Sequence, residues 1–162
     1  MKPRIYVETS VISYLTARSS RDPVKAARQL QAQALWDARD RFNLMVSPAV
    51  FDEALRGSPA AAARREQAMS GLPVLGLTQE ASYLAQLLLE RKALPSKALA
   101  DAVHIAIATT HKIKVVASFN FKHLAGVFAR AKIESTLRQL GYEPPLIATP
   151  EEILGVNDEA NN

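Results

Sequence analysis

The sequence predicts a three-layer α/β/α fold, in which helices cover both faces of a central, mainly parallel sheet. Short apolar runs, such as 5–7 and 115–119, alternate along the chain with longer segments of helical periodicity. Parallel strands need a crossover connection, which is usually a helix, so this alternation favours a parallel sheet. The two runs are followed by polar side chains, Glu8 and Asn120. Right-handed crossovers place the carboxyl ends of the strands at one edge, where ligands of such folds bind.

The first half of the chain is expected to contain three strands and five helices. The predicted strands are 4–8, 42–46 and 74–77, and the predicted helices are 10–17, 23–41, 48–57, a segment from 59, and 78–92. Asp22 and Ser58 are capping residues, and each precedes a proline suited to the first helical position. The second helix has an apolar stripe that should face the core: Val24, Ala27, Leu30, Ala34, Leu35 and Ala38.

The second half continues the same alternation of elements. Its predicted elements are a helix at 97–111, a strand at 114–118, a helical turn at 121–125, a helix at 131–140 and a strand at 146–148. Thr149 and Glu152 have the spacing of a capping box, which opens a last helix. No repeat or linker interrupts the pattern, so residues 1–156 are predicted to form one domain and 157–162 a polar tail.

The composition excludes several classes of protein. Of 162 residues, 48% are apolar, which excludes general disorder, and the lack of cysteine excludes disulfides and thiolate metal sites. No apolar run approaches the roughly 20 residues that span a bilayer, and the N-terminus lacks a signal-peptide core. We therefore expect a cytoplasmic protein with no membrane segment. The net charge of +4 is mild and would assist a polyanionic substrate without establishing one.

Four oxygen-bearing side chains are candidates for a shared site: Glu8, Glu53, Asp101 and Asn120. Glu8 and Asn120 follow buried strands, Glu53 has apolar neighbours on its helix, and Asp101 interrupts an apolar helix. Gathered at one edge, their oxygens would hold a hard divalent cation, which points to metal-dependent phosphodiester chemistry. Simpler interpretations exist: Glu8 and Asp101 suit a helix dipole, Glu53 could be solvated, and Asn120 could form a turn.

Other residues near these four could support them. Thr9 can cap the next helix or bond a carboxylate, and Ser118 could orient its neighbours or complete a strand. His104 lies three residues after Asp101 on the same helix face, so it could support the site, contact substrate or pack in the core. The sequence contains no glycine-rich phosphate loop, no Gly-x-Ser-x-Gly elbow and no histidine pair with zinc spacing.

The order and spacing of these motifs resemble the PIN domain, and within it the VapC-type toxins of bacterial toxin–antitoxin pairs. The resemblance is carried by residues 8–10, Glu53, Asp101 and residues 118–121, and it covers about residues 4–154. It implies a three-layer fold and an endoribonuclease that depends on Mg²⁺ or Mn²⁺. It also implies a cognate antitoxin and a homodimer.

Carried over by position, the implied catalytic residues are Glu8, Glu53, Asp101 and Asn120. The implied metal ligands are Glu8 and Asp101, and Thr9 and Ser118 match supporting hydroxyls. Glu8 stands where the family usually has Asp, and Asn120 replaces a position that is often acidic. Both changes keep oxygen donors. Glu8 is one methylene longer than Asp, and the uncharged Asn120 lowers the negative charge of the cluster, so the presence of a second metal ion is in doubt.

The hypothesis is that a metal-activated water attacks an RNA phosphodiester. Arg64, Arg65 and Lys122 are candidates for holding the RNA backbone. Two alternatives remain: a catalytically weak or inactive PIN-like module that binds RNA or protein, and a metal-dependent nuclease that acts on DNA.

Overall fold

A parallel sheet of four strands forms the centre of the computed structural model, which describes residues 1–155. The strand order is β2-β1-β3-β4, and all three pairings are parallel. The strands are β1 (Arg4–Val7), β2 (Asn43–Met45), β3 (Val115–Ala117) and β4 (Leu146–Ala148). The predicted fold class is confirmed. The predicted tail at 157–162 and the last residue of the predicted domain lie outside the described residues.

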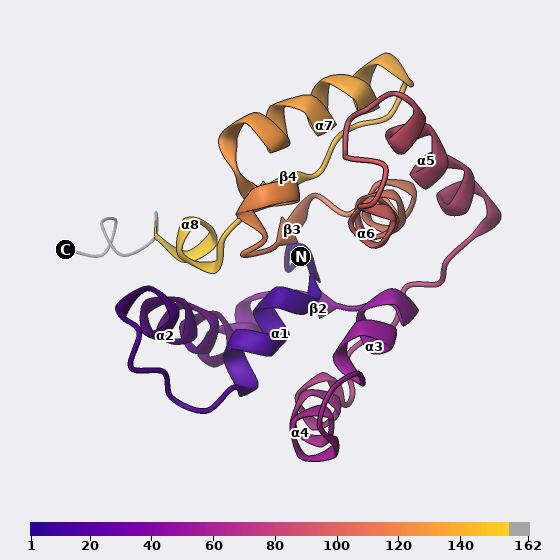
Figure 1. Ribbon diagram of the computed structural model, residues 1–162. Helices are drawn as coiled ribbons and strands as arrows, with labels where there is room; N and C mark the ends of the chain where they lie inside the picture. The colour runs from indigo at the N-terminus through magenta and orange to yellow at the C-terminus, as the bar shows by residue number, and fades with distance from the viewer. Residues whose placement is uncertain (156–162) are drawn as a thin grey trace.

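Helices cover both faces of this sheet. They are α1 (Thr9–Thr16), α2 (Pro23–Asp37), α3 (Pro48–Ala54), α4 (Pro59–Met69), α5 (Gln79–Glu90), α6 (Leu99–Thr110), α7 (Val127–Gln139) and α8 (Pro150–Leu154). Figure 1 shows α1 and α2 on one side of the strands and α5, α6 and α7 on the other. Short helical turns, η1 (Arg39–Arg41) and η2 (Phe121–Ala125), complete the described chain. None of the helices in this part is long and apolar enough to cross a membrane.

The two central strands lie in the middle of the core. Ile5, Tyr6 and Val7 of β1 are almost fully buried, as are Val116 and Ala117 of β3. Strands with buried residues on both faces appear in sequence as continuous apolar runs, which explains why these two were easy to predict. Because all four strands are parallel, the residues that follow β1 and β3 emerge at the same edge.

The predicted helix starts are largely confirmed. The side chain of Asp22 caps α2, that of Ser58 caps α4, and Thr149 and Glu152 form the expected capping box on α8. Ser47 precedes α3 but its side chain makes no cap. Its hydroxyl instead bonds to a buried tyrosine, described below. A tertiary contact therefore replaces the helix cap that the local sequence predicted.

Two predicted elements differ from the structure. The strand predicted at 74–77 is wrong: only Val74 makes a bridge, with Val46. Pro73 has no N–H to donate, and Val74 and Leu77 are about half exposed, so nothing extends the pairing. Helix α7 starts at Val127, four residues before the predicted position. The reason is that Gly126 both ends the η2 turn and serves as the N-cap residue of α7.

Helices α2 and α6 also need correction. The apolar stripe predicted for α2 is mostly wrong: Val24 and Leu30 are 58% and 73% exposed, and of its members only Leu35 is buried, together with Ala32 from outside the stripe. The α-helix ends at Asp37 rather than near Arg41, where the short η1 turn follows. Helix α6 begins at Leu99 rather than at residue 97, because the residues before it form a turn.

Candidate active site

Glu8 is held rigidly at the end of β1, where it caps helix α1. Only 4% of its surface is exposed, and its backbone N–H donates to the Ala117 carbonyl of β3 at 3.0 Å. The Ser10 N–H donates to Oε2 at 2.8 Å and the Ser10 hydroxyl to Oε1 at 2.7 Å. A third donor, the Ser118 hydroxyl, reaches Oε1 at 2.6 Å. This buried carboxylate has three donors and, in residues 1–155, no lysine or arginine paired with it, so it is oriented for a ligand or a reaction rather than for solvent.

Ser118 and Asn120 bring the end of β3 to the same place. The Ser118 hydroxyl, which donates to Glu8, also accepts from the Asn120 N–H at 3.0 Å. The Ser10 hydroxyl likewise accepts from the Phe119 N–H at 2.9 Å. Two serines therefore tie the ends of β1 and β3 together around one carboxylate. Ser118 has the supporting position that the sequence predicted, and Ser10 shares it.

Glu53 reaches the site from helix α3. The Thr9 hydroxyl donates to its Oε1 at 3.0 Å, and the same oxygen accepts a short hydrogen bond from His104 Nε2. Thr9 therefore supports Glu53 rather than Glu8. Within residues 1–155, the second oxygen, Oε2, has no hydrogen-bond partner, and the side chain is 30% exposed. That oxygen is available to a ligand.

A chain of hydrogen bonds runs from Glu53 into the core. His104 is completely buried on α6, and its Nδ1 bonds to the Tyr6 hydroxyl at 2.6 Å. The Tyr6 hydroxyl also bonds to the Ser47 hydroxyl at 2.7 Å. His104 thus supports the site, one of its predicted alternatives, while Tyr6 and Ser47 were not foreseen. The one sign of Tyr6 in the sequence is a hydroxyl within an apolar strand, which must find a partner when buried.

Asp101 lies at the start of α6 and is linked to the η2 turn. The Asn120 amide donates to Oδ1 at 3.1 Å, and Oδ2 bonds to His123 Nδ1 at 2.8 Å. Asn120 Oδ1 accepts from the His123 N–H, so its amide caps η2 and bridges to Asp101 at once. The turn-forming interpretation of Asn120 is therefore confirmed, and its role in the site stays a prediction that its contact with Asp101 supports. The contact from His123 to Asp101 was not predicted.

The ionisation of the Glu53–His104 pair is set by opposing effects. Burial raises the pKa of Glu53, but the hydrogen bond and charge of His104 and the Thr9 hydroxyl lower it to below its ordinary value. Burial lowers the pKa of His104, but the bond to Glu53 and the nearby carboxylates raise it to above its ordinary value. The net directions favour an imidazolium paired with a carboxylate. Burial also raises the pKa of Tyr6 far above its usual range, so this hydroxyl stays protonated.

The four predicted positions meet around the end of β1, although not all in one contact. Glu8, Glu53 and His104 each offer a ligand atom, and these three atoms lie within 4.8 Å of one another. Asp101 is not a member of this group, but it lies one helical turn from His104 and is linked to Glu8 through Asn120 and Ser118. The carboxylate oxygens of Glu8, Glu53 and Asp101 are hard donors that fit Mg²⁺ or Mn²⁺, whereas both nitrogens of His104 are already bonded, to Glu53 and Tyr6.

The predicted RNA-binding cations lie in different environments. Arg64 Nε donates to the Thr16 carbonyl at 3.1 Å, and Arg65 donates to the carbonyls of Ala54 and Arg56, both at 2.6 Å. Arg65 therefore connects α4 to the end of α3. Lys122 is exposed on η2 next to Asn120, so it is the one of the three that adjoins the candidate site directly.

Comparisons with solved structures show similarity of the fold. The fold is similar to that of VapC20 from Mycobacterium tuberculosis, described as a sarcin-ricin loop cleaving toxin. That match has 22% identity and a TM-score of 0.59, and it covers 78% of this chain and 94% of the other. The fold is also similar to that of VapBC2 from Rickettsia felis, solved with a DNA fragment from its promoter. Here the identity is 14%, the TM-score 0.53 and the coverage 74% and 89%.

Likenesses at this level of identity show the fold, and the family comes from the sequence itself. No curated protein matches the chain. The model of the PIN domain family matches residues 5–127, which span β1 to the start of α7 and include Glu8, Glu53, Asp101 and Asn120. The chain therefore belongs to the PIN domain family.

Proposed function

We propose that this protein is an endoribonuclease that depends on Mg²⁺ or Mn²⁺ and acts as the toxin of a toxin–antitoxin pair. The observation that supports this most is the pair of carboxylates, Glu8 and Glu53, held close together at the carboxyl edge of the sheet. Within residues 1–155, no lysine or arginine forms an ion pair with Glu8, Glu53 or Asp101. In the same residues, Glu53 and Asp101 pair only with histidines, His104 and His123, so repulsion among the clustered carboxylates remains, and a divalent cation would relieve it.

The residues that would hold the metal are Glu8, Glu53 and Asp101. Glu8 is the most rigid of them, and Glu53 keeps one oxygen free while Thr9 and His104 fix the other. A bound divalent cation would supply a more acidic water and would offset the charge of a phosphodiester under attack. Asp101 or Glu53 would orient that water or accept its proton, which requires that they stay ionised.

Asn120 would act through Asp101 in this scheme. Its amide N–H₂ donates to Asp101 while its oxygen accepts from the η2 backbone, so it fixes the carboxylate without adding charge. Fewer negative charges hold fewer cations, which favours one metal ion over two.

The family and the fold support the proposed biological role. The chain belongs to the PIN domain family, and two solved relatives by fold are named VapC20 and VapBC2. On this basis we infer an RNA substrate, a cognate antitoxin, a homodimer and a cytoplasmic location. Co-expression with the product of a neighbouring gene would test the antitoxin, because a true antitoxin restores growth that the toxin inhibits.

Cleavage of RNA by the purified protein tests the enzymatic proposal. We expect cleavage with Mg²⁺ or Mn²⁺, none with EDTA, and a loss of at least about 100-fold in Asp101→Asn, as is common when a catalytic group is removed. The Asp52→Asn variant is a matched control, because Asp52 lies on α3 beside Glu53 but is exposed to solvent. Equal cleavage in all these samples would refute the metal mechanism.

A further inference from the structure

We propose that a cavity beside the candidate site binds one nucleotide of the RNA strand that flanks the scissile phosphate. This inference rests on the proposed nuclease function and names a second place where that substrate is held. The cavity has a volume of about 560 Å³ and lies between the segment that joins α5 to α6 and the elements η2 and α7. Cavities of roughly 300–1,000 Å³ are typical of sites for small organic ligands.

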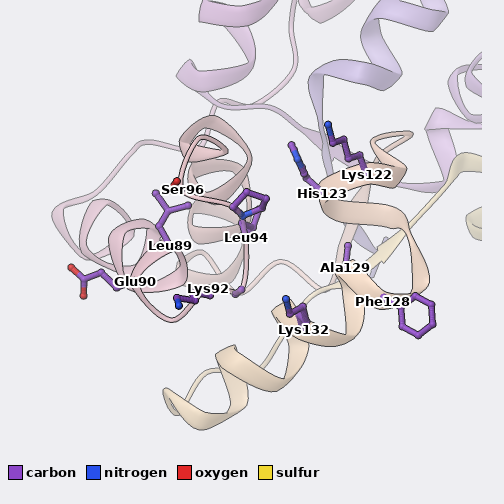
Figure 2. Close-up of a pocket in the computed structure, with 12 residues that line it drawn as sticks. Leu89, Glu90, Lys92, Leu94, Ser96, Lys122, His123, Phe128, Ala129 and Lys132 are labelled. Atoms are coloured by element: carbon purple, nitrogen blue, oxygen red, sulfur yellow. The ribbon is translucent and has the colours of Figure 1, made fainter.

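The cavity combines an apolar floor with a cationic rim. Leu89, Leu94 and Ala129 supply apolar lining on which the face of a base could rest. Figure 2 shows Lys122 at one end, next to His123, and Lys92 and Lys132 at the other. Three lysines against the single carboxylate of Glu90 give the rim a net positive charge, and Figure 2 shows the Glu90 carboxylate away from Lys122 and His123.

The lysines are free to meet a ligand. In the part of the chain that the structure describes, none of Lys92, Lys122 and Lys132 forms an ion pair, and all three are exposed. Unpaired ammonium groups spaced around an apolar hollow complement phosphate groups on either side of a nucleobase. The chemistry of the cavity therefore matches a nucleotide within a strand better than it matches an uncharged metabolite.

His123 connects the cavity to the candidate site. Its Nδ1 bonds to Asp101 at 2.8 Å, while the same side chain lines the cavity. Its second ring nitrogen, Nε2, is buried and has no hydrogen-bond partner in residues 1–155. The unpartnered Nε2 can form one further hydrogen bond, and polar groups of a base or a ribose hydroxyl, which both donates and accepts, can supply the partner.

This connection is the reason to favour RNA over an acidic peptide. A strand whose phosphate lies at Asp101 can continue past His123 and Lys122 into the cavity, because His123 contacts Asp101 and both residues line the cavity. An acidic peptide would use the lysines equally well, but nothing in the cavity connects such a peptide to the carboxylates.

The test is the salt dependence of RNA binding, measured with a labelled single-stranded octanucleotide in EDTA so that cleavage cannot interfere. For Lys92→Gln/Lys132→Gln we expect weaker binding and a slope of log K against log salt that is smaller by about 1.4, since each phosphate contact on a single strand contributes about 0.7. The control is Lys2→Gln/Lys114→Gln, which removes two charges before β1 and β3, at the opposite edge of the sheet. The control should leave the slope unchanged. An equal loss in both variants, or none in the first, overturns the proposal.

A second variant fills the cavity without changing charge. Ala129→Met should weaken RNA binding several-fold while leaving the salt slope unchanged, because it removes space and not a phosphate contact. Binding that Ala129→Met leaves unaltered would contradict the apolar part of the site. If labelled deca-glutamate loses affinity for the lysine variant while RNA does not, the cavity is a peptide site and the proposal is wrong.

These measurements are independent of catalysis. A protein that binds RNA through the cavity but does not cleave it with Mg²⁺ or Mn²⁺ would refute the nuclease proposal alone. A protein that cleaves RNA, but whose lysine and Ala129 variants bind as the unaltered chain does, would refute the nucleotide site alone.

Discussion

The Tyr6→Phe substitution tests whether the buried hydrogen-bond chain behind Glu53 stabilises the fold and the site. It removes one oxygen and leaves the ring that packs in the core. Two completely buried groups then lose a partner: His104 Nδ1 at 2.6 Å and the Ser47 hydroxyl at 2.7 Å. A buried polar group left without a partner costs about 1–3 kcal/mol.

Since Ser47 can turn its hydroxyl toward another acceptor, we expect a total loss of about 2–4 kcal/mol in the free energy of unfolding. For a chain of this length, each kcal/mol lowers Tm by about 2–4 °C, so Tm should fall by roughly 4–16 °C. Urea unfolding of the metal-free protein measures the loss directly. The matched control is Tyr142→Phe, whose hydroxyl bonds to Glu80 at 2.9 Å on the surface. It should cost no more than about 0.5 kcal/mol.

The same substitution should also weaken metal binding, because His104 loses the partner that orients its ring toward Glu53. Loss of such a supporting contact typically costs about 10–100-fold in metal affinity. Calorimetric titration with Mn²⁺ would measure the affinity of each protein for the metal. A Tyr6→Phe protein as stable as the unaltered chain, with the same affinity for Mn²⁺, would refute the idea that the chain from Ser47 to Glu53 acts as a unit.

Two further predictions concern the metal and pH. Mn²⁺ at 100 times its Kd should stabilise the folded protein by about 2.7 kcal/mol. The Glu8→Gln substitution should abolish this stabilisation. If Mn²⁺ up to millimolar concentration does not raise Tm, a binding module without metal is favoured instead. In metal-free protein, the lowered pKa of Glu53 contributes stability above its ordinary value of 4.5, and this is lost as pH falls through the folded pKa. The raised pKa of His104 contributes stability below 6.5, and this is lost as pH rises through the folded pKa. Both contributions are fully present between pH 4.5 and 6.5. The free energy of unfolding, measured at several pH values, should therefore be greatest in that range. His104→Gln should flatten it, and an unchanged profile in that variant would contradict the assignment.

The sequence predicts the central elements of the fold well and its outer elements less well, for physical reasons. Strands β1 and β3 are buried on both faces, so their apolar runs are unmistakable. The apolar run at 74–77 lies at the edge of the sheet, where only Val74 forms a bridge. A run of this kind therefore does not by itself mark a strand. The exposed side of α2 was misjudged because alanine suits both the core and the surface, and Val24 and Leu30 lie on a side that no element of residues 1–155 covers.

At the site, the sequence indicates which carboxylates matter but not how they are held. Glu8 and Asn120 stand out because each follows a buried strand, and strand direction alone then places them together. The contact of His104 with Glu53 joins residues 51 positions apart, and that of Tyr6 with His104 joins residues 98 apart. Pairings of this kind depend on how α3 and α6 pack, which no local pattern in the chain encodes.

The groups that contact the candidate carboxylates determine how much negative charge a metal ion would meet at the site. In residues 1–155, each candidate carboxylate is held by hydroxyl, amide, backbone N–H or imidazole groups, and none by lysine or arginine. A lysine or arginine would neutralise the carboxylates and compete with a divalent ion. Hydroxyl and backbone N–H donors orient Glu8 without adding positive charge, whereas the imidazolium of His104 offsets part of the charge of Glu53. Lys92, Lys122 and Lys132 lie instead around the neighbouring cavity. Negative charge is thus concentrated where a metal ion would bind and positive charge where a phosphate strand would lie. Placing a lysine in the carboxylate cluster, as in Thr9→Lys, should therefore weaken Mn²⁺ binding without weakening RNA binding in EDTA, because the three lysines around the cavity remain.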